Sequence, residues 1–208
     1  MIACQGSLLD RAGRIGPRRA APPPTRIGLG SGAWVEHRHL RLEGGAELLE
    51  ALLEVVPWRA ERRWMYDRFV EVPRLTCFYE EGEALPHPAL EEVRASLDAG
   101  YRADAGGGFD TCGLALYRDG GDSVAWHGDR IGRGATQDTV VAIVSLGATR
   151  TLALRPRGGG RARRYELASG DLLVMGGSCQ RSFDHSVPKT ARPVGARVSL
   201  QFRPSGVR

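Results

Sequence analysis

Two segments in the first half of the chain carry apolar residues at helical spacing. Over residues 46–56, apolar side chains recur along one face with acidic ones opposite them, until Pro57 ends the pattern. A second stripe runs over residues 88–99, with a proline in the first turn and Gly100 after the last. The pattern predicts two amphipathic helices. Neither carries catalytic chemistry, so we expect both to support a sheet.

After Gly108 the pattern changes to short stretches of strand-forming residues separated by glycine-rich turns. Strands are predicted over residues 111–118, 123–128, 139–146, 150–155, 164–167, 171–175, 184–187 and 196–203. Short strands in this number, preceded by helices, are typical of a double-stranded β-helix, the jelly-roll arrangement of cupins. The predicted fold class is therefore mainly β (α+β), a jelly-roll with supporting N-terminal helices.

The domain organisation follows from where these patterns begin. Residues 1–32 are rich in glycine, proline and arginine and show no sustained periodicity, which predicts a flexible tail. The remaining residues, 33–208, suit one domain with a substantial core. Within it, residues 33–107 would hold the supporting helices and residues 108–204 the jelly-roll.

The composition narrows the class of protein further. The net charge is +5, and Lys189 is the only lysine. A basic excess favours polyanions, although solvated surface arginines would give the same balance. No apolar run is long enough for a membrane span and the arginine-rich start does not resemble a signal peptide, so we expect a cytoplasmic monomer without membrane contact. The four cysteines lack CxxC spacing, which predicts buried thiols.

The strongest chemical pattern is a histidine and a carboxylate two positions apart, followed by a distant histidine. Residues two apart on a strand point the same way, so His127 and Asp129 can bind one ion, and His185 can complete the set. Two imidazoles and a carboxylate form the facial triad of non-heme Fe(II) oxygenases, which leaves positions open for an oxo-acid and O2. Taken singly, either histidine would more often be a hydrogen-bonded interior residue. We expect His37, His39 and His87 to lie on the surface.

The C-terminal strand has one polar and one apolar face. Alternation places Arg197, Ser199, Gln201 and Arg203 on one side, and the apolar residues between them on the other. In an ordinary sheet the polar face would meet water. Inside a jelly-roll that holds a dicarboxylate, the same face would bind it, because a guanidinium matches a carboxylate with two parallel hydrogen bonds.

An ordered series of motifs resembles the AlkB family of Fe(II)/2-oxoglutarate-dependent dioxygenases over roughly residues 33–204. The motifs are Val72-Pro73-Arg74-Leu75, Leu116-Tyr117-Arg118-Asp119-Gly120, Asp122-Ser123-Val124, Trp126-His127-Gly128-Asp129, Val144-Ser145-Leu146-Gly147, Gly170-Asp171-Leu172-Leu173-Val174-Met175, His185-Ser186-Val187-Pro188-Lys189 and Arg197-Val198-Ser199-Leu200-Gln201-Phe202-Arg203.

The resemblance implies a reaction, its cofactors and the roles of several residues. His127, Asp129 and His185 match the iron ligands. Three further residues match the 2-oxoglutarate site, where Arg197 would pair with the distal carboxylate, Tyr117 would assist it and Arg203 would lie near the chelating carboxylate. Ser199 stands where the family often has asparagine. The implied reaction uses Fe(II), 2-oxoglutarate and O2 to hydroxylate an N-alkyl carbon of a nucleic-acid base, and releases aldehyde, succinate and CO2.

Two positions depart from the family pattern. Ala115 stands where many members carry an asparagine that contacts the co-substrate, so one hydrogen bond is missing or supplied elsewhere. Ile131 stands where well-known repair enzymes carry an acidic residue that reads the exocyclic amine of the base. An isoleucine side chain cannot accept a hydrogen bond, so either another residue reads the base or the substrate differs.

Substrate contacts are predicted mainly from the region before the jelly-roll. An enzyme that acts on a base holds it against aromatic rings, and single strands make this easier. We expect Trp64, Tyr66, Arg74 and Tyr79, together with position 131, to contact the nucleotide, so that residues 33–107 include a nucleotide-recognition region. Alternatively, this stretch is a β-hairpin whose rings pack on the core. Five arginines between 155 and 164 would either follow phosphates or lie in a solvated loop.

Three classes of function are consistent with these patterns. The first is a dealkylase of DNA or RNA bases that prefers single strands. The second is a 2-oxoglutarate-dependent oxygenase acting on a protein or a small molecule, which the residue at position 131 keeps open. The third is a non-catalytic cupin-like metal-binding protein, which the complete triad together with Arg197 disfavours.

Overall fold

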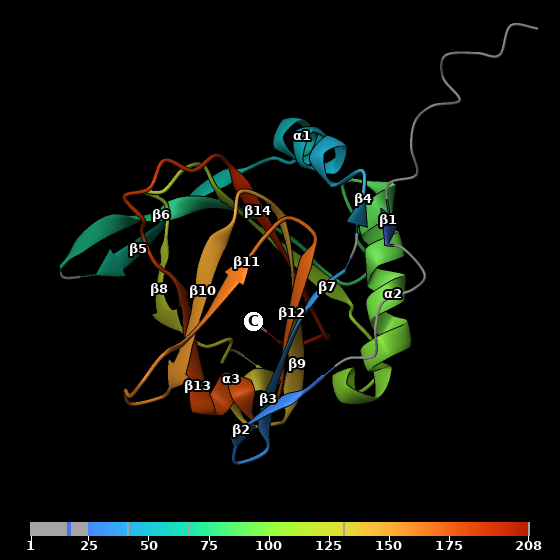
Figure 1. The fold of residues 1–208 in the computed structure, drawn as a ribbon, viewed down its shortest axis with the longest axis vertical. Helices are drawn as coiled ribbons and strands as arrows, with labels where there is room; N and C mark the ends of the chain where they lie inside the picture. The colour runs from blue at the N-terminus through green and yellow to red at the C-terminus, as the bar shows by residue number, and fades with distance from the viewer. Residues whose placement is uncertain (1–15, 18–24, 41, 66, 131, 208) are drawn as a thin grey trace, which may run out of the picture.

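Two facing β-sheets form the body of the protein, and two helices cover the outer face of the larger one (Figure 1). The computed structural model describes residues 16–17, 25–40, 42–65, 67–130 and 132–207. The larger sheet has the strand order β2 (Ile27–Gly30), β3 (Ala33–His39), β12 (Asp171–Gly177), β9 (Thr139–Gly147), β14 (Arg197–Arg203), β7 (Thr111–Tyr117), β6 (Arg68–Tyr79) and β5 (Arg59–Met65). The smaller sheet has the order β11 (Arg163–Leu167), β10 (Arg150–Pro156), β13 (Phe183–Val187) and β8 (Val124–His127).

The remaining elements are short or lie outside the two sheets. They are the paired strands β1 (Gly16–Pro17) and β4 (Leu42–Glu43), the helices α1 (Gly45–Val55), α2 (Pro88–Ala105) and α3 (Cys179–Ser182), and the 3-10 helix η2 (Arg133–Ala135). All eight predicted strands are present as β7 to β14, with ends displaced by no more than two residues. The predicted fold class, a jelly-roll with supporting N-terminal helices, is confirmed. None of the helices described is both long and apolar enough to cross a bilayer.

Apolar side chains fill two separate layers. One cluster lies between the sheets and includes Val35, Ile143, Leu154 and Met175. The other lies between the larger sheet and the helices, and α1 contributes Leu48 and Leu52 to it. Because strand residues alternate between faces, β9, β12 and β14 each supply side chains to the helix layer and to the interior of the jelly-roll. The helices therefore stabilise the sheet from outside and leave its inner face available for chemistry.

Helix α2 is longer than its sequence predicts. It does not end at Gly100 but continues to Ala105, and Gly106, with φ of 67°, ends it. Tyr101 and Ala105 extend the buried stripe, and their burial offsets the roughly 1 kcal/mol that a glycine costs inside a helix.

The N-terminal boundary also needs correction. The sequence predicts residues 27–30 as part of the tail, but they pair as β2 with β3, and the sequence predicts neither strand. The sequence Ile27-Gly28-Leu29-Gly30 has too few side chains to show an alternating pattern, although its backbone still forms the ladder hydrogen bonds. Most of the predicted tail, residues 1–15 and 18–24, lies outside the described residues.

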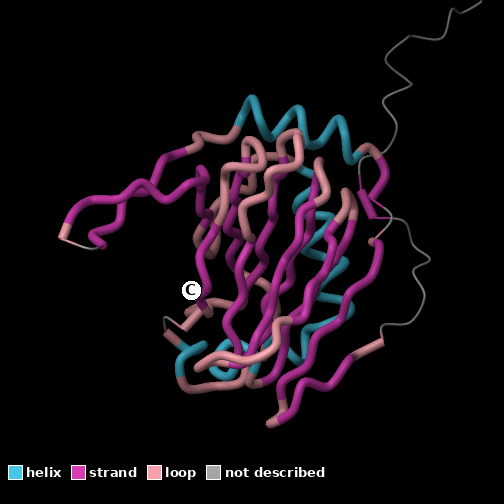
Figure 2. The backbone as a smooth tube through the Cα atoms, turned by 60° about the vertical axis from the view of Figure 1, so that its left-hand side comes forward, coloured by secondary structure: helices cyan, strands magenta, loops and turns pink. Residues whose placement is uncertain are grey.

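A long β-hairpin extends the larger sheet past the jelly-roll. Strand β6 pairs with β7 through residues 75–79, and β5 pairs with β6. In Figure 2 this hairpin projects from the body of the protein. The sequence leaves open, as an alternative for this aromatic stretch, a β-hairpin whose rings pack on the core. The backbone does form a hairpin, and the positions of the described rings are given with the site below. Its inner residues lie at the mouth of the jelly-roll, so the hairpin forms one wall of the site described next.

Candidate metal centre and co-substrate site

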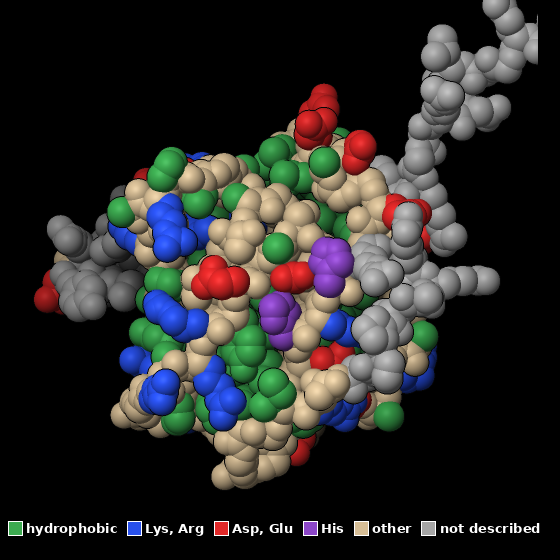
Figure 3. All heavy atoms as spheres, viewed as in Figure 1, with side chains coloured by type: hydrophobic (Ala, Val, Ile, Leu, Met, Phe, Trp, Pro, Cys, Tyr) green, Lys and Arg blue, Asp and Glu red, His purple; other side chains and the backbone are tan. Residues whose placement is uncertain are grey.

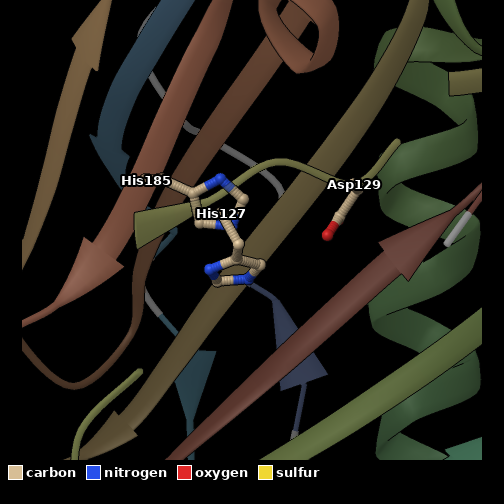
Figure 4. Close-up of side chains that lie close together, drawn as sticks. All are labelled: His127, Asp129 and His185. Atoms are coloured by element: carbon tan, nitrogen blue, oxygen red, sulfur yellow. The ribbon is translucent and has the colours of Figure 1, made fainter. Parts of the chain in front are cut away.

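The three predicted metal ligands come together at the inner face of the smaller sheet. Strands β8 and β13 are antiparallel and place His127 directly opposite His185, with 4.2 Å between the ring centroids. One potential ligand atom from each of His127, Asp129 and His185 lies within 4.8 Å of the others. Figure 4 shows the Asp129 carboxylate directed towards the two imidazoles. This donor set fits one Fe(II) ion.

The sequence predicts that Asp129 lies on the same strand as His127, but the structure differs. Strand β8 ends at His127, and Asp129 lies in the loop that follows. Gly128 turns the chain in a confined space, because a Cβ there would lie 2.8 Å from the carbonyl oxygen of Gln180. The side-chain oxygen of Gln180 accepts a hydrogen bond from the Asp129 N–H at 3.2 Å. The carboxylate is thus positioned by loop contacts rather than by strand alternation.

The protonation states suit metal binding at neutral pH. Burial lowers the pKa of His127 and lowers that of His185 to about 3, so both imidazoles are neutral. The Nδ1–H of His127 donates to the Ala125 carbonyl oxygen at 2.8 Å, which leaves Nε2 for a metal ion. Burial alone would raise the pKa of Asp129, but the Arg203 guanidinium together with the two imidazoles outweighs burial, and the pKa is lowered.

Arg203 connects the metal centre to the C-terminal strand. Its Nε donates to Oδ2 of Asp129 at 2.7 Å, and both side chains are buried. Its Nη2 donates to Oε1 of Gln201 at 2.6 Å. The ion pair holds the carboxylate in one orientation and places a cation beside the metal ligands. Arg203 therefore lies where the family resemblance expects a cation near the chelating carboxylate.

Arg197 has the properties of an anchor for a buried carboxylate. The side chain is only 1% exposed, and its Nε donates to Ser145 Oγ at 2.9 Å. Its Nη1 atom is buried without a hydrogen-bond partner among the described residues. Burial lowers its pKa to about 10, so it remains a cation at neutral pH. The Arg197 Cζ lies 5.2 Å from the centroid of the Tyr117 ring. A buried guanidinium nitrogen without a partner in the described structure fits the distal carboxylate of 2-oxoglutarate.

Two small residues, Ser199 and Ala115, are paired on the neighbouring strands β14 and β7. Both side chains are buried. The hydroxyl of Ser199 therefore lies beside the position where the family pattern has an asparagine. The described residues show no contact that replaces the missing amide.

A cavity of about 490 Å³ opens onto the metal ligands from the side of the hairpin. His127, Asp129 and Arg203 line it together with Phe78 of β6. Opposite Phe78 lies Gly113, where a Cβ would be only 3.0 Å from Arg203 Nη1, so a side chain there would crowd the cavity. A second cavity, of about 500 Å³, is lined by Trp126, His127 and Lys189.

The predicted substrate contacts have different positions. Arg74 lines both cavities and donates from Nη1 to the Tyr117 hydroxyl at 3.3 Å, so it lies beside the predicted centre. Tyr79 instead packs against the core on the α2 side, and burial raises the pKa of its hydroxyl to about 12. This position does not fit a role in stacking on a base. Tyr66, Ile131 and the side chain of Trp64 lie outside the described residues.

The sequence places Phe78 among the aromatic rings of residues 62–79 without singling it out, and in the structure this ring lines the cavity. Residues 74, 76 and 78 share a face of β6, so Phe78 accompanies Arg74, whereas Tyr79 points the opposite way. Strand parity measured from Arg74 would have identified it.

The other histidines lie away from this centre. His37 and His39 hydrogen-bond to the two oxygens of Asp171, and His87 caps the N-terminus of α2 by accepting from the Ala89 N–H.

Comparison with known proteins agrees with this geometry. The family model of the 2OG-Fe(II) oxygenase superfamily (2OG is 2-oxoglutarate) matches residues 32–203. The human alpha-ketoglutarate-dependent dioxygenase alkB homolog 3 is 33% identical over a region covering 75% of this chain and 60% of that protein. The DNA oxidative demethylase ALKBH2 of Arabidopsis thaliana is 29% identical, covering 88% of this chain and 70% of the relative.

A solved structure supports the fold. The structure of OsALKBH1 superposes with a TM-score of 0.61 at 14% sequence identity, covering 86% of this chain and all of the other. This chain spans about 60% of the length of the alkB homolog 3 proteins it matches. The family uses Fe(II), 2-oxoglutarate and O2, which agrees with the His-Asp-His donor set and the buried arginines. The chain belongs to the AlkB family of the 2OG-Fe(II) oxygenase superfamily.

Proposed function

We propose that this protein is an Fe(II)- and 2-oxoglutarate-dependent dioxygenase that removes alkyl groups from N-alkylated bases of nucleic acid. The observation that carries the proposal is the unpartnered Nη1 of Arg197, buried in the same interior as a complete His-Asp-His triad. A non-catalytic metal-binding protein has no need for a buried carboxylate anchor beside its metal. The relatives named as an alkB dioxygenase and as a DNA oxidative demethylase support the choice of reaction and substrate.

The protein side chains divide the work between binding and orientation. His127, Asp129 and His185 would hold the iron, and Arg197 with Tyr117 would bind the distal carboxylate of 2-oxoglutarate. Together the bound groups would use O2 to hydroxylate the alkyl carbon and convert 2-oxoglutarate to succinate and CO2. In the hydroxylated product the N–C bond breaks and its electron pair stays on the base nitrogen, while the alkyl carbon leaves as an aldehyde. The hydroxyl proton passes to solvent when the alkylated base is cationic and to the base nitrogen when it is neutral. Arg203 would keep the Asp129 carboxylate in place throughout.

The proposed substrate is single-stranded, and the proposed enzyme acts as a monomer. Extracting a base from a duplex costs a few kcal/mol that a single strand does not require. Phe78 offers an aromatic surface at the cavity, and Arg74 a cation beside it. Figure 3 shows Lys and Arg side chains gathered over the part of the smaller sheet where β10 and β13 lie. The arginines of this region are Arg155, Arg157, Arg161, Arg163 and Arg164. Arg155 lies over the exposed ring of Trp126, with Cζ 4.1 Å from its centroid, and could contact phosphates there.

The decisive experiment is a panel of methylated oligonucleotides, single-stranded and duplex, of DNA and RNA. Formaldehyde and succinate are measured together, and the oligonucleotide mass is followed. Stoichiometric loss of a methyl group that requires both Fe(II) and 2-oxoglutarate is expected, with single strands turned over faster. Raising the salt concentration should weaken oligonucleotide binding steeply if phosphates supply the affinity.

A second candidate keeps the same chemistry on a protein or small molecule, and Ile131 favours it because its side chain cannot read a base edge. Succinate formation driven by such a compound, with no oligonucleotide demethylated, would replace the proposed function with this one.

A further inference from the structure

Two carboxylates line the cavity besides Asp129, namely Glu61 and Glu80. Glu80 is exposed, whereas Glu61 is half-buried and held by a neighbouring side chain. Glu61 of β5 lines the same cavity as His127 and Asp129. Its Oε1 accepts a hydrogen bond from Thr76 Oγ1 of β6 at 2.7 Å. A carboxylate offers about four lone-pair sites, so the hydrogen bond from Thr76 orients the group without using up its ability to accept from a ligand. No pattern in the sequence singles out Glu61.

A break in the β5–β6 ladder accounts for the position of Glu61. Ala60 pairs with Leu75, but Arg62 pairs with Glu71, so the register shifts at Glu61 and residues 72–74 lie opposite it. Pro73 within that segment has no N–H to donate to the ladder, and its carbonyl oxygen accepts from the Ser123 N–H at 2.7 Å. Bulges of this kind re-aim side chains and recur beside active sites. This one brings Glu61 and Arg74 to the same cavity.

The chemistry of alkylated bases separates two kinds of substrate at such a carboxylate. Alkylation of a ring nitrogen that carries no hydrogen, such as N1 of adenine, gives a cationic base edge with an exocyclic N–H donor beside it. Alkylation of a ring nitrogen that carries a hydrogen, such as N1 of hypoxanthine, replaces that hydrogen and gives a neutral edge with a carbonyl acceptor beside it. A carboxylate binds the first by a charge-assisted hydrogen bond and opposes the second, since two acceptors would face each other.

We propose that Glu61 forms the base-edge subsite of this enzyme and selects cationic, amine-bearing alkylated bases, in place of the acidic side chain that position 131 lacks. This inference rests on the proposed function of base dealkylation. Glu61 would receive the exocyclic N–H of the base, while Thr76 keeps the carboxylate directed into the cavity. The selectivity then comes from the hairpin rather than from the loop that follows Asp129.

The test compares two single-stranded oligonucleotides that differ only at one base edge. One carries 1-methyladenine, which is cationic with an exocyclic amine at C6, and the other 1-methylhypoxanthine, which is neutral with a carbonyl at C6 and has no exocyclic amine. In Glu61→Gln, kcat/KM for 1-methyladenine should fall by about 10- to 100-fold, as expected for loss of a hydrogen bond between charged groups, and that for 1-methylhypoxanthine by less than about threefold. The ratio between the two substrates is insensitive to partial unfolding of the variant.

Two additions make the result specific to Glu61. Glu81→Gln removes the same charge from an exposed residue of the turn after β6 that does not line this cavity, and it should leave the ratio unchanged. Binding of both oligonucleotides is also measured with Mn(II) and N-oxalylglycine, which do not support turnover, and Glu61→Gln should weaken only the 1-methyladenine complex.

The two hypotheses fail in different ways. A wild-type protein that turns over neither base contradicts the proposed function. A wild-type protein that is active, with the same substrate ratio and the same binding ratio in Glu61→Gln, contradicts the role of Glu61 and leaves the proposed function intact. An equal change of the ratio in Glu81→Gln also contradicts it, because the effect would then be one of overall charge.

Discussion

Arg130 and Asp184 form an ion pair, with 3.0 Å between Nη1 and Oδ1. Arg130 directly follows the predicted metal ligand Asp129, and Asp184 directly precedes the predicted ligand His185. The side chains are 33% and 14% exposed, so the pair is only partly screened by water. It ties the loop that carries Asp129 to strand β13, which carries His185. We interpret it as a positioning contact for the metal centre.

Breaking this pair should weaken metal binding modestly. Asp184→Asn is expected to lower Mn(II) affinity by about two- to fivefold, since a partly exposed ion pair is worth up to about 1 kcal/mol. The affinity is measured by titration of the metal-free protein. Asp104→Asn is the control, because it breaks the Arg26–Asp104 pair on helix α2, which covers the outer face of the larger sheet. Equal affinities in the wild type and Asp184→Asn would show that the pair does not position the ligands.

Arg197→Lys should raise the requirement for 2-oxoglutarate. An ammonium cannot donate simultaneously to Ser145 and, through two parallel bonds, to a carboxylate. The KM for 2-oxoglutarate is expected to rise at least about tenfold, the effect of losing about 1.4 kcal/mol, with a smaller change in kcat. Steady-state succinate formation measures both. Ser145→Ala, which removes only the partner of Nε, should give a smaller rise, and an unchanged KM in Arg197→Lys would contradict its role as anchor.

Asp129 should contribute to stability as well as to metal binding. In Asp129→Ala the buried Arg203 loses its ion-pair partner, which is expected to cost about 3 kcal/mol in the metal-free protein. Asp129→Asn keeps an acceptor for the Arg203 Nε–H and should cost less, although both variants should lose turnover. Unfolding with denaturant and succinate formation distinguish the two effects. Identical stabilities for the two variants would argue against an energetic role of the Arg203 contact.

A second carboxylate gives a pH-dependent prediction. Asp122 accepts hydrogen bonds from the backbone N, Nε and Nη2 of Arg118, and the side-chain bonds are the main reason that its pKa is lowered. The pKa of Asp122 is lower in the folded protein than in the unfolded chain, where it is about 4. The stabilisation is therefore complete at pH values above about 4 and is lost as the pH falls towards the folded-state pKa. Asp122→Asn should therefore cost about 1–2 kcal/mol at pH 7 and less at pH 3. Denaturant unfolding at both pH values tests this, and an equal cost at both would contradict it.

The sequence predicts best those parts of the site that depend on strand alternation. Arg197, Ser199 and Arg203 are interior because they alternate with the apolar residues of β14, and this pattern can be read directly. The position of Asp129 could not be derived this way, since Gly128 and Gln180 determine it through contacts distant in sequence.

Glu61 was out of reach for a related reason. A register shift between two strands leaves no periodic trace in the sequence of either, so the face on which Glu61 lies depends on its pairing with residues 72–74. The aromatic ring of Tyr79 favours a place in the site. Because neighbouring strand residues point to opposite faces, however, Tyr79 packs against the core on the face of β6 opposite to Phe78.

The two-faced character of β14 has a consequence for changes in chain length. Inserting one residue within this strand would reverse the faces of all residues on one side of the insertion. Either Arg197 or Arg203 would then enter the apolar layer under the helices, and the apolar residues next to it would turn inward, which should destabilise the fold. Inserting two would preserve both faces but displace Arg197 from Arg203 by about 7 Å, at roughly 3.4 Å per residue. Such a protein should fold while losing the spacing between the two cations. The distance between its two arginines therefore fixes the length of β14 as firmly as the alternation of its faces fixes its register.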